Sequence, residues 1–297
     1  MNLTTEYKKK VVEALKLQRE QLALSDARLA RRYGVSASVF SRIMNGETER
    51  VLDEGKWLAI GRELNVNKNE RNWKVVKTDV FKVIEEQILF CKEHSKARMF
   101  VDECEIGKTF TAKYLSRTLQ NCFYIDVSQC KTRNLFVRAL AKAIGLDSSG
   151  MLNELKENIK YYISIIDEPV IILDEFGDAS NGLFLELKEF WNATENICGW
   201  YMMGAEGLRY RIERNIRYGM IGFAEIRSRF STRMGNIMPV NIEEKKLFYK
   251  KLITDVIVSN AVDKSIVTSV VNKCLVQIDG KFGGLRRAES LLILLDK

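Results

Sequence analysis

The chain has 297 residues, 46% of them hydrophobic, and its formal net charge is +8. This length allows two or three domains with hydrophobic cores. The charged N-terminal segment lacks the apolar region of a signal peptide, and no segment approaches the roughly 18 apolar residues of a membrane span, so we expect a cytoplasmic protein without membrane contact. The six cysteines and one histidine show no metal-ligand spacing. The excess of basic residues indicates a polyanionic partner without identifying it.

Residues 24–46 carry two helix starts and a tight turn. Ser25 and Ser36 are suited to cap the two helices, and Gly34 is suited to the turn between them. Residues 57–64 predict a helix that closes the small core. This layout resembles the helix-turn-helix domains of phage repressors, so we expect an all-α helix-turn-helix DNA-binding domain over residues 1–70. Helical spacing predicts that its core includes Ala27, Leu29, Ala30, Val35, Val39 and Ile43.

The second helix of this layout leaves small or hydrogen-bonding side chains facing outward. The candidates for DNA contact there are Ser36, Ser38 and Arg42. Only Arg42 is an obvious reader of guanine, so we expect weak sequence preference. Basic residues outnumber acidic ones over residues 1–75, which favours contact with phosphates. The alternative is a small helical bundle that mediates protein contacts.

A polar, asparagine-rich segment at 65–72 predicts a linker, and the chain beyond it alternates between helices and strands. This alternation favours an α/β fold with a parallel sheet covered on both faces and a site at the carboxyl ends of the strands. The predicted helices lie near 79–94, 132–145, 150–166 and 180–196, and the predicted strands at 97–101, 122–127, 169–173 and 199–203.

Two motifs in this region fit the two halves of a nucleoside triphosphate site. Gly107, Lys108 and Thr109 fit the end of a phosphate-binding loop, where backbone N–H groups at a helix N-terminus cradle phosphates and the lysine adds a point charge. A buried strand that ends in Asp174 and Glu175 would direct Asp174 toward Mg²⁺ and Glu175 toward an attacking water. We expect Thr109 and Asp174 to ligate the metal. The candidate cofactor contacts are Cys104, Glu105, Ile106, Gly107, Lys108, Thr109, Phe110 and Asp174.

The loop departs from the usual pattern at two positions. The pattern has glycine where this chain has Asp102, and related ATPases often have another glycine at the position of Glu105. Acidic side chains repel a polyphosphate, and any side chain restricts the backbone there. We therefore expect low ATP affinity or weak turnover, and a loop that no longer works is the alternative.

Further motifs accompany the loop and the acidic strand end. They are Ile-Gly-Lys-Thr at 106–109, Tyr-Ile-Asp-Val at 124–127, Ile-Leu-Asp-Glu at 172–175, Met-Gly-Ala-Glu-Gly-Leu at 203–208, Glu-Ile-Arg-Ser-Arg at 225–229 and Gly-Gly-Leu-Arg-Arg at 283–287. With these motifs the chain resembles the AAA+ ATPases, and within them the transposon target-selection ATPases of the phage Mu B type. The resemblance implies an AAA+ nucleotide-binding core over 71–240 and a small C-terminal helical lid over 241–297.

The resemblance also implies roles for basic residues late in the chain. Arg286 or Arg287 would be the sensor-2 arginine that reaches the nucleotide phosphates from the lid. Arg229, with Arg227 and Arg233 as alternatives, would be an arginine finger that acts on the nucleotide of a neighbouring subunit, which implies a homo-oligomer. Where the family usually has Asn or Thr after the fourth strand, this chain has Ala205, which cannot orient a water.

Two groups of basic residues in the core are further candidates for DNA contact. Such residues neutralise phosphates without reading sequence. For the group that follows the fourth strand, a solvated helix face is the alternative. The candidates are Arg209, Arg211 and Arg214 in that group, and Lys131, Arg133 and Arg138 after the second core strand.

The residues predict an ATPase that uses ATP and Mg²⁺ and binds double-stranded DNA. The resemblance adds that it assembles on the duplex as a helical filament or ring, selects a target site and recruits or activates a transposase. One alternative is a helicase loader or initiator-like AAA+ protein. The other is a DNA-binding regulator that responds to nucleotide without hydrolysing it.

Overall fold

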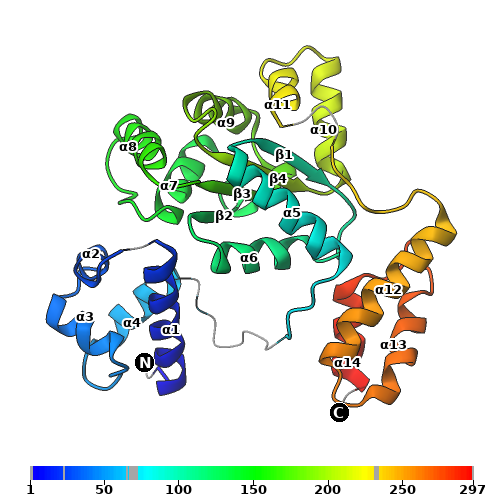
Figure 1. Cartoon of the computed structure of the whole chain (residues 1–297), viewed down its shortest axis with the longest axis horizontal. Coiled ribbons are helices and arrows are strands. Elements are labelled where there is room, and N and C mark those ends of the chain that lie inside the picture. Colours follow the sequence, from blue (N-terminus) through cyan, green and yellow to red (C-terminus); the bar gives the residue numbers. More distant parts are fainter. Residues whose placement is uncertain (1–2, 23, 65, 67–72, 231–233, 296–297) are drawn as a thin grey trace. The chain divides into compact units, whose positions relative to one another are not determined.

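The computed structural model describes residues 3–22, 24–64, 66, 73–230 and 234–295. Packing divides the chain into two compact units (Figure 1). The first comprises Met1–Asn72 and Arg117–Asn121, and the second comprises Trp73–Ser116 and Cys122–Lys297. Over the described part of the chain, no helix combines the length and the apolar character needed to cross a membrane.

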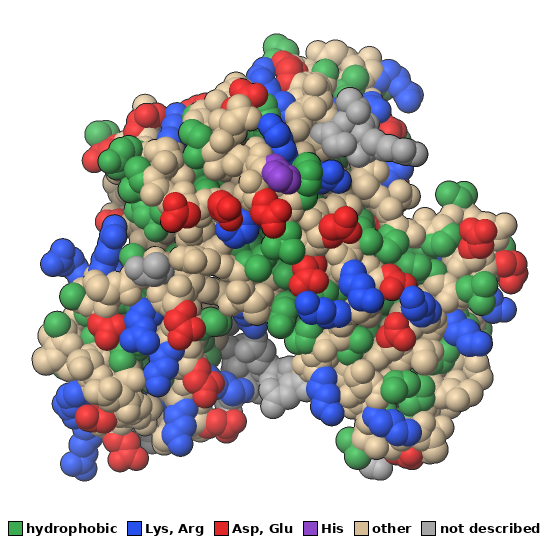
Figure 2. All heavy atoms as spheres, in the orientation of Figure 1, with side chains coloured by type: hydrophobic (Ala, Val, Ile, Leu, Met, Phe, Trp, Pro, Cys, Tyr) green, Lys and Arg blue, Asp and Glu red, His purple; other side chains and the backbone are tan. Residues whose placement is uncertain are grey.

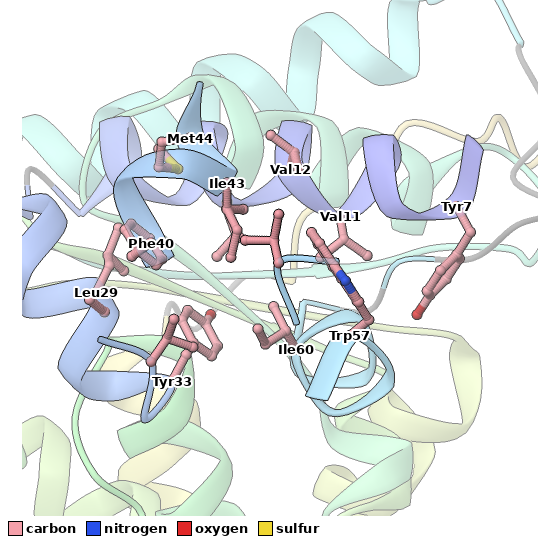
Figure 3. Packing of buried hydrophobic residues seen from close by; sticks show 14 residues of the cluster. Tyr7, Val11, Val12, Leu29, Tyr33, Phe40, Ile43, Met44, Trp57 and Ile60 are labelled. Carbon is pink, nitrogen blue, oxygen red and sulfur yellow. The ribbon is translucent and has the colours of Figure 1, made fainter. Parts of the chain in front are cut away.

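The N-terminal unit is a bundle of four helices around one apolar core. They are α1 (Thr5–Gln21), α2 (Asp26–Arg32), α3 (Ala37–Met44) and α4 (Glu54–Glu63). Figure 3 shows side chains from all four helices pointing toward one another, with Leu29, Phe40 and Trp57 among them, and these three are fully buried. Burial of such large side chains supplies the main stabilisation of this small unit.

Helices α2 and α3 begin as the sequence predicts. The hydroxyl oxygen of Ser25 accepts the N–H of Arg28, and that of Ser36 accepts the N–H of Val39. Gly34, between the helices, has a φ of +58°, a conformation that glycine adopts without strain. Among the predicted core residues, Ala27 is the exception, because it is exposed on another side of α2 than Leu29 and Ala30.

The second unit contains a four-stranded sheet in which every neighbouring pair is parallel. Its strands are β1 (Ala97–Val101), β2 (Cys122–Asp126), β3 (Val170–Asp174) and β4 (Gly199–Gly204), in the order β1-β4-β3-β2. The predicted parallel sheet is therefore confirmed. On the side of β1 that faces away from β4, Gly235 donates its N–H to the carbonyl of Met99 and its carbonyl accepts the N–H of Val101, both at 2.9 Å.

Helices cover both faces of this sheet (Figure 1). Successive residues of a strand point to opposite faces. On β4, the Tyr201 hydroxyl donates to Gln87 in α5, whereas the Trp200 ring N–H donates to Thr194, directly after α9. The helices α5 and α9 therefore lie on opposite faces, with α6 beside α5 and with α7 and α8 on the side of α9. Their bounds are α5 Asp79–His94, α6 Lys108–Thr118, α7 Arg133–Ala143, α8 Leu152–Ile165 and α9 Asn181–Ala193.

Among the residues that the structure describes, five further α-helices follow the last strand. Helix α10 (Glu206–Arg217) begins directly after β4, and α11 (Phe223–Arg229) packs against α9 and α10. The last three, α12 (Ile242–Asn260), α13 (Val267–Cys274) and α14 (Leu285–Leu295), pack against one another. We call these three the C-terminal helices.

Candidate nucleotide site

The loop between β1 and α6 turns sharply into a helix N-terminus. Gly107 has a φ of +99° and Glu105 a φ of +63°, so two left-handed residues bend the chain just before α6 begins at Lys108. The first N–H groups of a helix have no partner within it, and they form a natural cradle for an anion. The backbone therefore has the shape that a phosphate site requires.

Lys108 is buried in this loop, and its ammonium group bonds to the loop's own backbone. The Nζ atom donates to the carbonyl oxygens of Asp102, at 2.8 Å, and Glu103, at 2.5 Å. Burial lowers the pKa of Lys108, while the nearby acidic groups oppose that shift. An ammonium has three donors, so this arrangement leaves one for a phosphate oxygen.

The acidic pair at the end of β3 lies at the same edge of the sheet as the loop. The buried Asp174 accepts the N–H of Glu175 and the hydroxyl of Tyr124, each at 2.9 Å. Burial, together with the charge of Asp174, raises the pKa of both Glu175 and Tyr124. The Tyr124 hydroxyl thus stays a donor and fixes one oxygen of Asp174. Sequence reasoning gave Tyr124 no role, because the contact joins two neighbouring strands.

The oxygen ligands offered by the candidate site fit Mg²⁺ as phosphate-binding loops bind it. Mg²⁺ prefers oxygen ligands and takes one or two from the protein, with phosphate and water completing the shell. Asp174 offers a carboxylate and Thr109, in the first turn of α6, offers a hydroxyl. Among the described residues, no cluster of three or more His, Cys, Asp or Glu could hold a metal by itself. A metal here would depend on the nucleotide for part of its shell.

The Asp102 side chain is buried and makes contacts that the sequence did not predict. It is 2% exposed, and its carboxylate accepts the N–H groups of Glu103, Ile237 and Met238 at 2.6–3.1 Å. The carboxylate therefore anchors the segment that leads to α12. Its charge is spread over three backbone donors, so strong repulsion of a polyphosphate by Asp102 does not follow from this arrangement.

The C-terminal helices meet the loop at two further acidic residues. The Glu103 carboxylate accepts bonds from Lys245 and from the Tyr249 hydroxyl, which lies 2.8 Å away. At the start of α14, the backbone N–H of Leu285 donates to the carbonyl of Glu105 at 2.8 Å, and the Arg286 guanidinium lies 3.4 Å from the Glu105 carboxylate. The structure thus places Arg286 at the loop.

Arg287 donates to the carbonyl of Val276 at 3.2 Å. Ala205 follows the end of β4 and occupies the N-cap position of α10, where it provides no side-chain cap. Arg209, one turn into α10, reaches the carbonyl of Val101 at 3.4 Å and pairs with Glu206 at 3.5 Å. Arg209 therefore places a cation beside the start of the loop, whereas Ala205 offers no polar side chain there.

Arg229 lies far from the loop of its own chain. Its guanidinium lies 4.9 Å from the centre of the Trp191 ring, and it lines a cavity of about 690 Å³ together with Lys96 and Arg98 at the amino end of β1. Among the described residues, its buried Nη1 atom has no hydrogen-bond partner. Arg227 is half-buried in α11, and Arg233 lies outside the described residues.

Most of the basic core residues predicted to contact DNA are bound within the chain. Lys131 pairs with Asp178 at 2.7 Å, and Arg133 pairs with the buried Glu186 at 2.6 Å. Three of the other four form the following contacts: Arg138 with the carbonyls of Ser148 and Gly150, Arg211 with Gly177 and Asn181, and Arg214 with the ring of Tyr218. The bonds of Arg138 and Arg211 to backbone carbonyls hold these two side chains within the chain, whereas Lys131 and Arg133 are about half exposed and their ion pairs can exchange for a phosphate.

In the N-terminal unit, the predicted DNA contacts are exposed. The Ser36 and Ser38 hydroxyls lie 3.2 Å apart, and Arg42 pairs with the exposed Glu47 at 2.8 Å. On the face of this unit visible in Figure 2, acidic side chains are interspersed with the Lys and Arg side chains. The basic surface is therefore interrupted on this face.

Residues 103–212 match the family model of an AAA domain. The matched segment runs from the second residue of the loop through Asp174 and Glu175 to α10. It supports an AAA+ type P-loop ATPase core for this part of the chain. A search among curated proteins found no match.

Proposed function

We propose that the chain binds Mg²⁺-ATP at the loop around Lys108 and hydrolyses it with Glu175 as the residue that orients the attacking water. The observation that carries this proposal is the placement of Lys108, Asp174 and Glu175 at one edge of the sheet, where Lys108 interacts electrostatically with both carboxyl groups. The bound metal would supply electrostatic stabilisation of the triphosphate. Lys108 would hold a phosphate oxygen, and the Tyr124 hydroxyl would keep Asp174 oriented.

The test uses two substitutions with different expected results. Lys108→Ala removes the point charge at the phosphates, so we expect loss of ATP binding in a direct binding assay with a fluorescent ATP analogue. Glu175→Gln keeps the shape of the side chain but not its charge, so ATP binding remains while hydrolysis falls by about 100-fold or more. A Lys108→Ala chain that still binds ATP, or a Glu175→Gln chain with normal turnover, would refute the assignment.

We further propose that nucleotide controls the binding of double-stranded DNA, with weak sequence preference, by a homo-oligomer in the form of a helical filament or ring. The support is that two short helices, α2 and α3, are joined by a turn at Gly34, that Arg42 is exposed on α3, and that the net charge is +8. Many weak phosphate contacts in an oligomer add up to tight, salt-sensitive binding. Electron microscopy of the chain with ATP and duplex DNA, with and without Lys108→Ala, tests this assembly.

Selection of a target site and recruitment of a transposase complete the proposal. The support is the order of the modules, because a unit of four helices precedes the candidate ATPase core, which is followed by three C-terminal helices. A strand-transfer assay with a candidate transposase tests the step, and a transposase gene beside that of this chain would support it. Stimulation that depends on ATP and is lost in Lys108→Ala is the expected result, and a lack of stimulation would favour a helicase loader or initiator.

One observation favours a second candidate, a nucleotide-responsive DNA-binding regulator without turnover. Ala205 offers no polar side chain at the end of β4, where one would help to orient water. Measuring ATP hydrolysis with and without duplex DNA separates the two functions. A folded chain that binds ATP but shows no turnover under either condition would be such a regulator.

A further inference from the structure

Glu103 connects the phosphate loop to α12 through both of its carboxylate oxygens. One oxygen accepts from Lys245 and the other from the Tyr249 hydroxyl. Lys245 and Tyr249 are four residues apart, so they lie on one face of α12. The ring of Tyr249 is buried and contacts that of Phe282, with the ring centres 5.9 Å apart, which fixes the position of its hydroxyl. The contact is therefore well defined and partly shielded from solvent.

Glu105 meets the start of α14 in a different way. Its backbone carbonyl accepts the N–H of Leu285, and a Cβ on Gly284 would lie only 2.4 Å from the Cβ of Glu105, so this close approach requires glycine. Its side chain pairs with Arg286 at 3.4 Å, and the Arg286 side chain is 78% exposed. An exposed pair of this kind is weak and readily exchanges partners.

We propose that these two neighbouring glutamates act on ATP binding with opposite signs. Glu103 is a positioning residue that holds α12, and with it the Arg286 guanidinium, at the loop. Glu105 competes with the nucleotide, because a triphosphate at the loop must replace its carboxylate as the partner of Arg286. This inference rests on the proposed function, since it concerns ATP at the same site.

Electrostatics alone predicts another result. If each carboxylate merely repelled a polyphosphate, neutralising either one would strengthen ATP binding. The contacts of Glu103 predict the reverse for that residue, because the loss of its charge weakens the ion pair with Lys245 that helps to hold α12 at the loop. The sign of the change in affinity therefore separates the two explanations.

The experiment uses the full chain with Mg²⁺ and a fluorescent ATP analogue. Coupling between the loop and α12 should make Glu103→Gln bind the nucleotide about fivefold to tenfold more weakly. Removing a weak competing pair should make Glu105→Gln bind about threefold more tightly. Lys245→Ala should reproduce the effect of Glu103→Gln. Lys246→Ala is the matched control, because Lys246 is exposed at the next position of the same helix, and it should leave affinity unchanged.

A second measurement needs no nucleotide. Hydrogen exchange over residues 242–260 should be faster in Glu103→Gln and Lys245→Ala than in the unsubstituted chain, and unchanged in Lys246→Ala. In steady-state hydrolysis, Glu103→Gln should raise the KM for ATP with little change in kcat, as expected of a residue that positions α12 rather than one that touches the reacting atoms.

The outcomes distinguish this inference from the proposed function. If the unsubstituted chain binds ATP and both glutamine variants bind it more tightly, the positioning role of Glu103 is overturned. If the unsubstituted chain binds no ATP, the proposed function fails. The hydrogen-exchange measurement still tests Glu103 in that case. If α12 exchanges at the same rate in Glu103→Gln and in the unsubstituted chain, Glu103 does not hold α12 at the loop.

Discussion

Asp102 stands where phosphate-binding loops usually have glycine, and its side chain has a structural role there. Its carboxylate accepts backbone N–H groups from Glu103 on one side and from Ile237 and Met238 on the other. Buried donors that lose their acceptor carry the full cost of desolvation. The residue therefore contributes to stability by joining the start of the loop to the segment that leads into α12.

We expect Asp102→Gly, which restores the usual loop residue, to destabilise the chain by about 2–3 kcal/mol and to leave ATP affinity no better than before. The loss arises because three backbone donors lose a buried acceptor. Asp102→Asn should cost less, since its amide oxygen still accepts hydrogen bonds. Urea unfolding and a nucleotide titration measure the two effects. Tighter ATP binding by a fully stable Asp102→Gly chain would show that repulsion dominates instead.

The sequence was sufficient to predict the residues of the candidate site that belong to local motifs. It did not predict the contacts between segments that are far apart in the chain. Lys108, Asp174 and Glu175 stand at fixed positions relative to a helix start and a strand end, so a local pattern identifies them. The bonds of Asp102 and of Tyr124 join segments far apart in the chain. No spacing or periodicity within a short window encodes such contacts, and their roles emerge only from the fold.

At the scale of elements, hydrophobic periodicity predicted the strands and helices of the core to within a few residues. Strand β2, for example, ends at Asp126 rather than Val127, and α9 ends at Ala193 rather than 196. The contacts of the basic residues on those elements could not be predicted in this way. Charge marks a residue as polar, but its partner depends on which elements pack beside it, as with Arg133 of α7 and Glu186 of α9.

Arg138 on α7 and Arg42 on α3 therefore should respond differently to substitution. Arg138 bonds the carbonyls of Ser148 and Gly150, so we expect Arg138→Ala to lower stability by about 1 kcal/mol with DNA affinity nearly unchanged. Arg42 is exposed, so Arg42→Ala should keep stability while weakening DNA binding and reducing its salt dependence by about one phosphate contact. Thermal unfolding and DNA titrations at several salt concentrations measure both. A large loss of DNA affinity in a stable Arg138→Ala chain would contradict this division.

At the scale of the whole molecule, the loop and Arg229 lie toward opposite ends of β1. The loop follows Val101, at the carboxyl end of the strand, whereas the Arg229 guanidinium packs on Trp191, near the end of α9 that leads into the start of β4. The two ends of a five-residue strand lie about 13 Å apart. A guanidinium near the amino ends of the strands cannot reach a phosphate at the loop of the same chain without a large rearrangement. If Arg229 stabilises the charge of a γ-phosphate, that phosphate belongs to a neighbouring subunit.

Mixing two inactive variants tests this arrangement. An oligomer of Lys108→Ala chains has no competent loop, and an oligomer of Arg229→Ala chains has no finger, so each alone should show little hydrolysis. In a mixture, some interfaces pair an intact loop from an Arg229→Ala chain with an intact arginine from a Lys108→Ala chain. Because random mixing at equal ratio makes about one interface in four fully intact, we expect recovery of up to about a quarter of the original ATPase activity. The control is the double variant, which carries both changes in every chain and should restore nothing when mixed with either single variant. If the two single variants form mixed oligomers, as shown by a pull-down with a tag on one of them, and turnover is still absent, Arg229 does not act across a subunit interface.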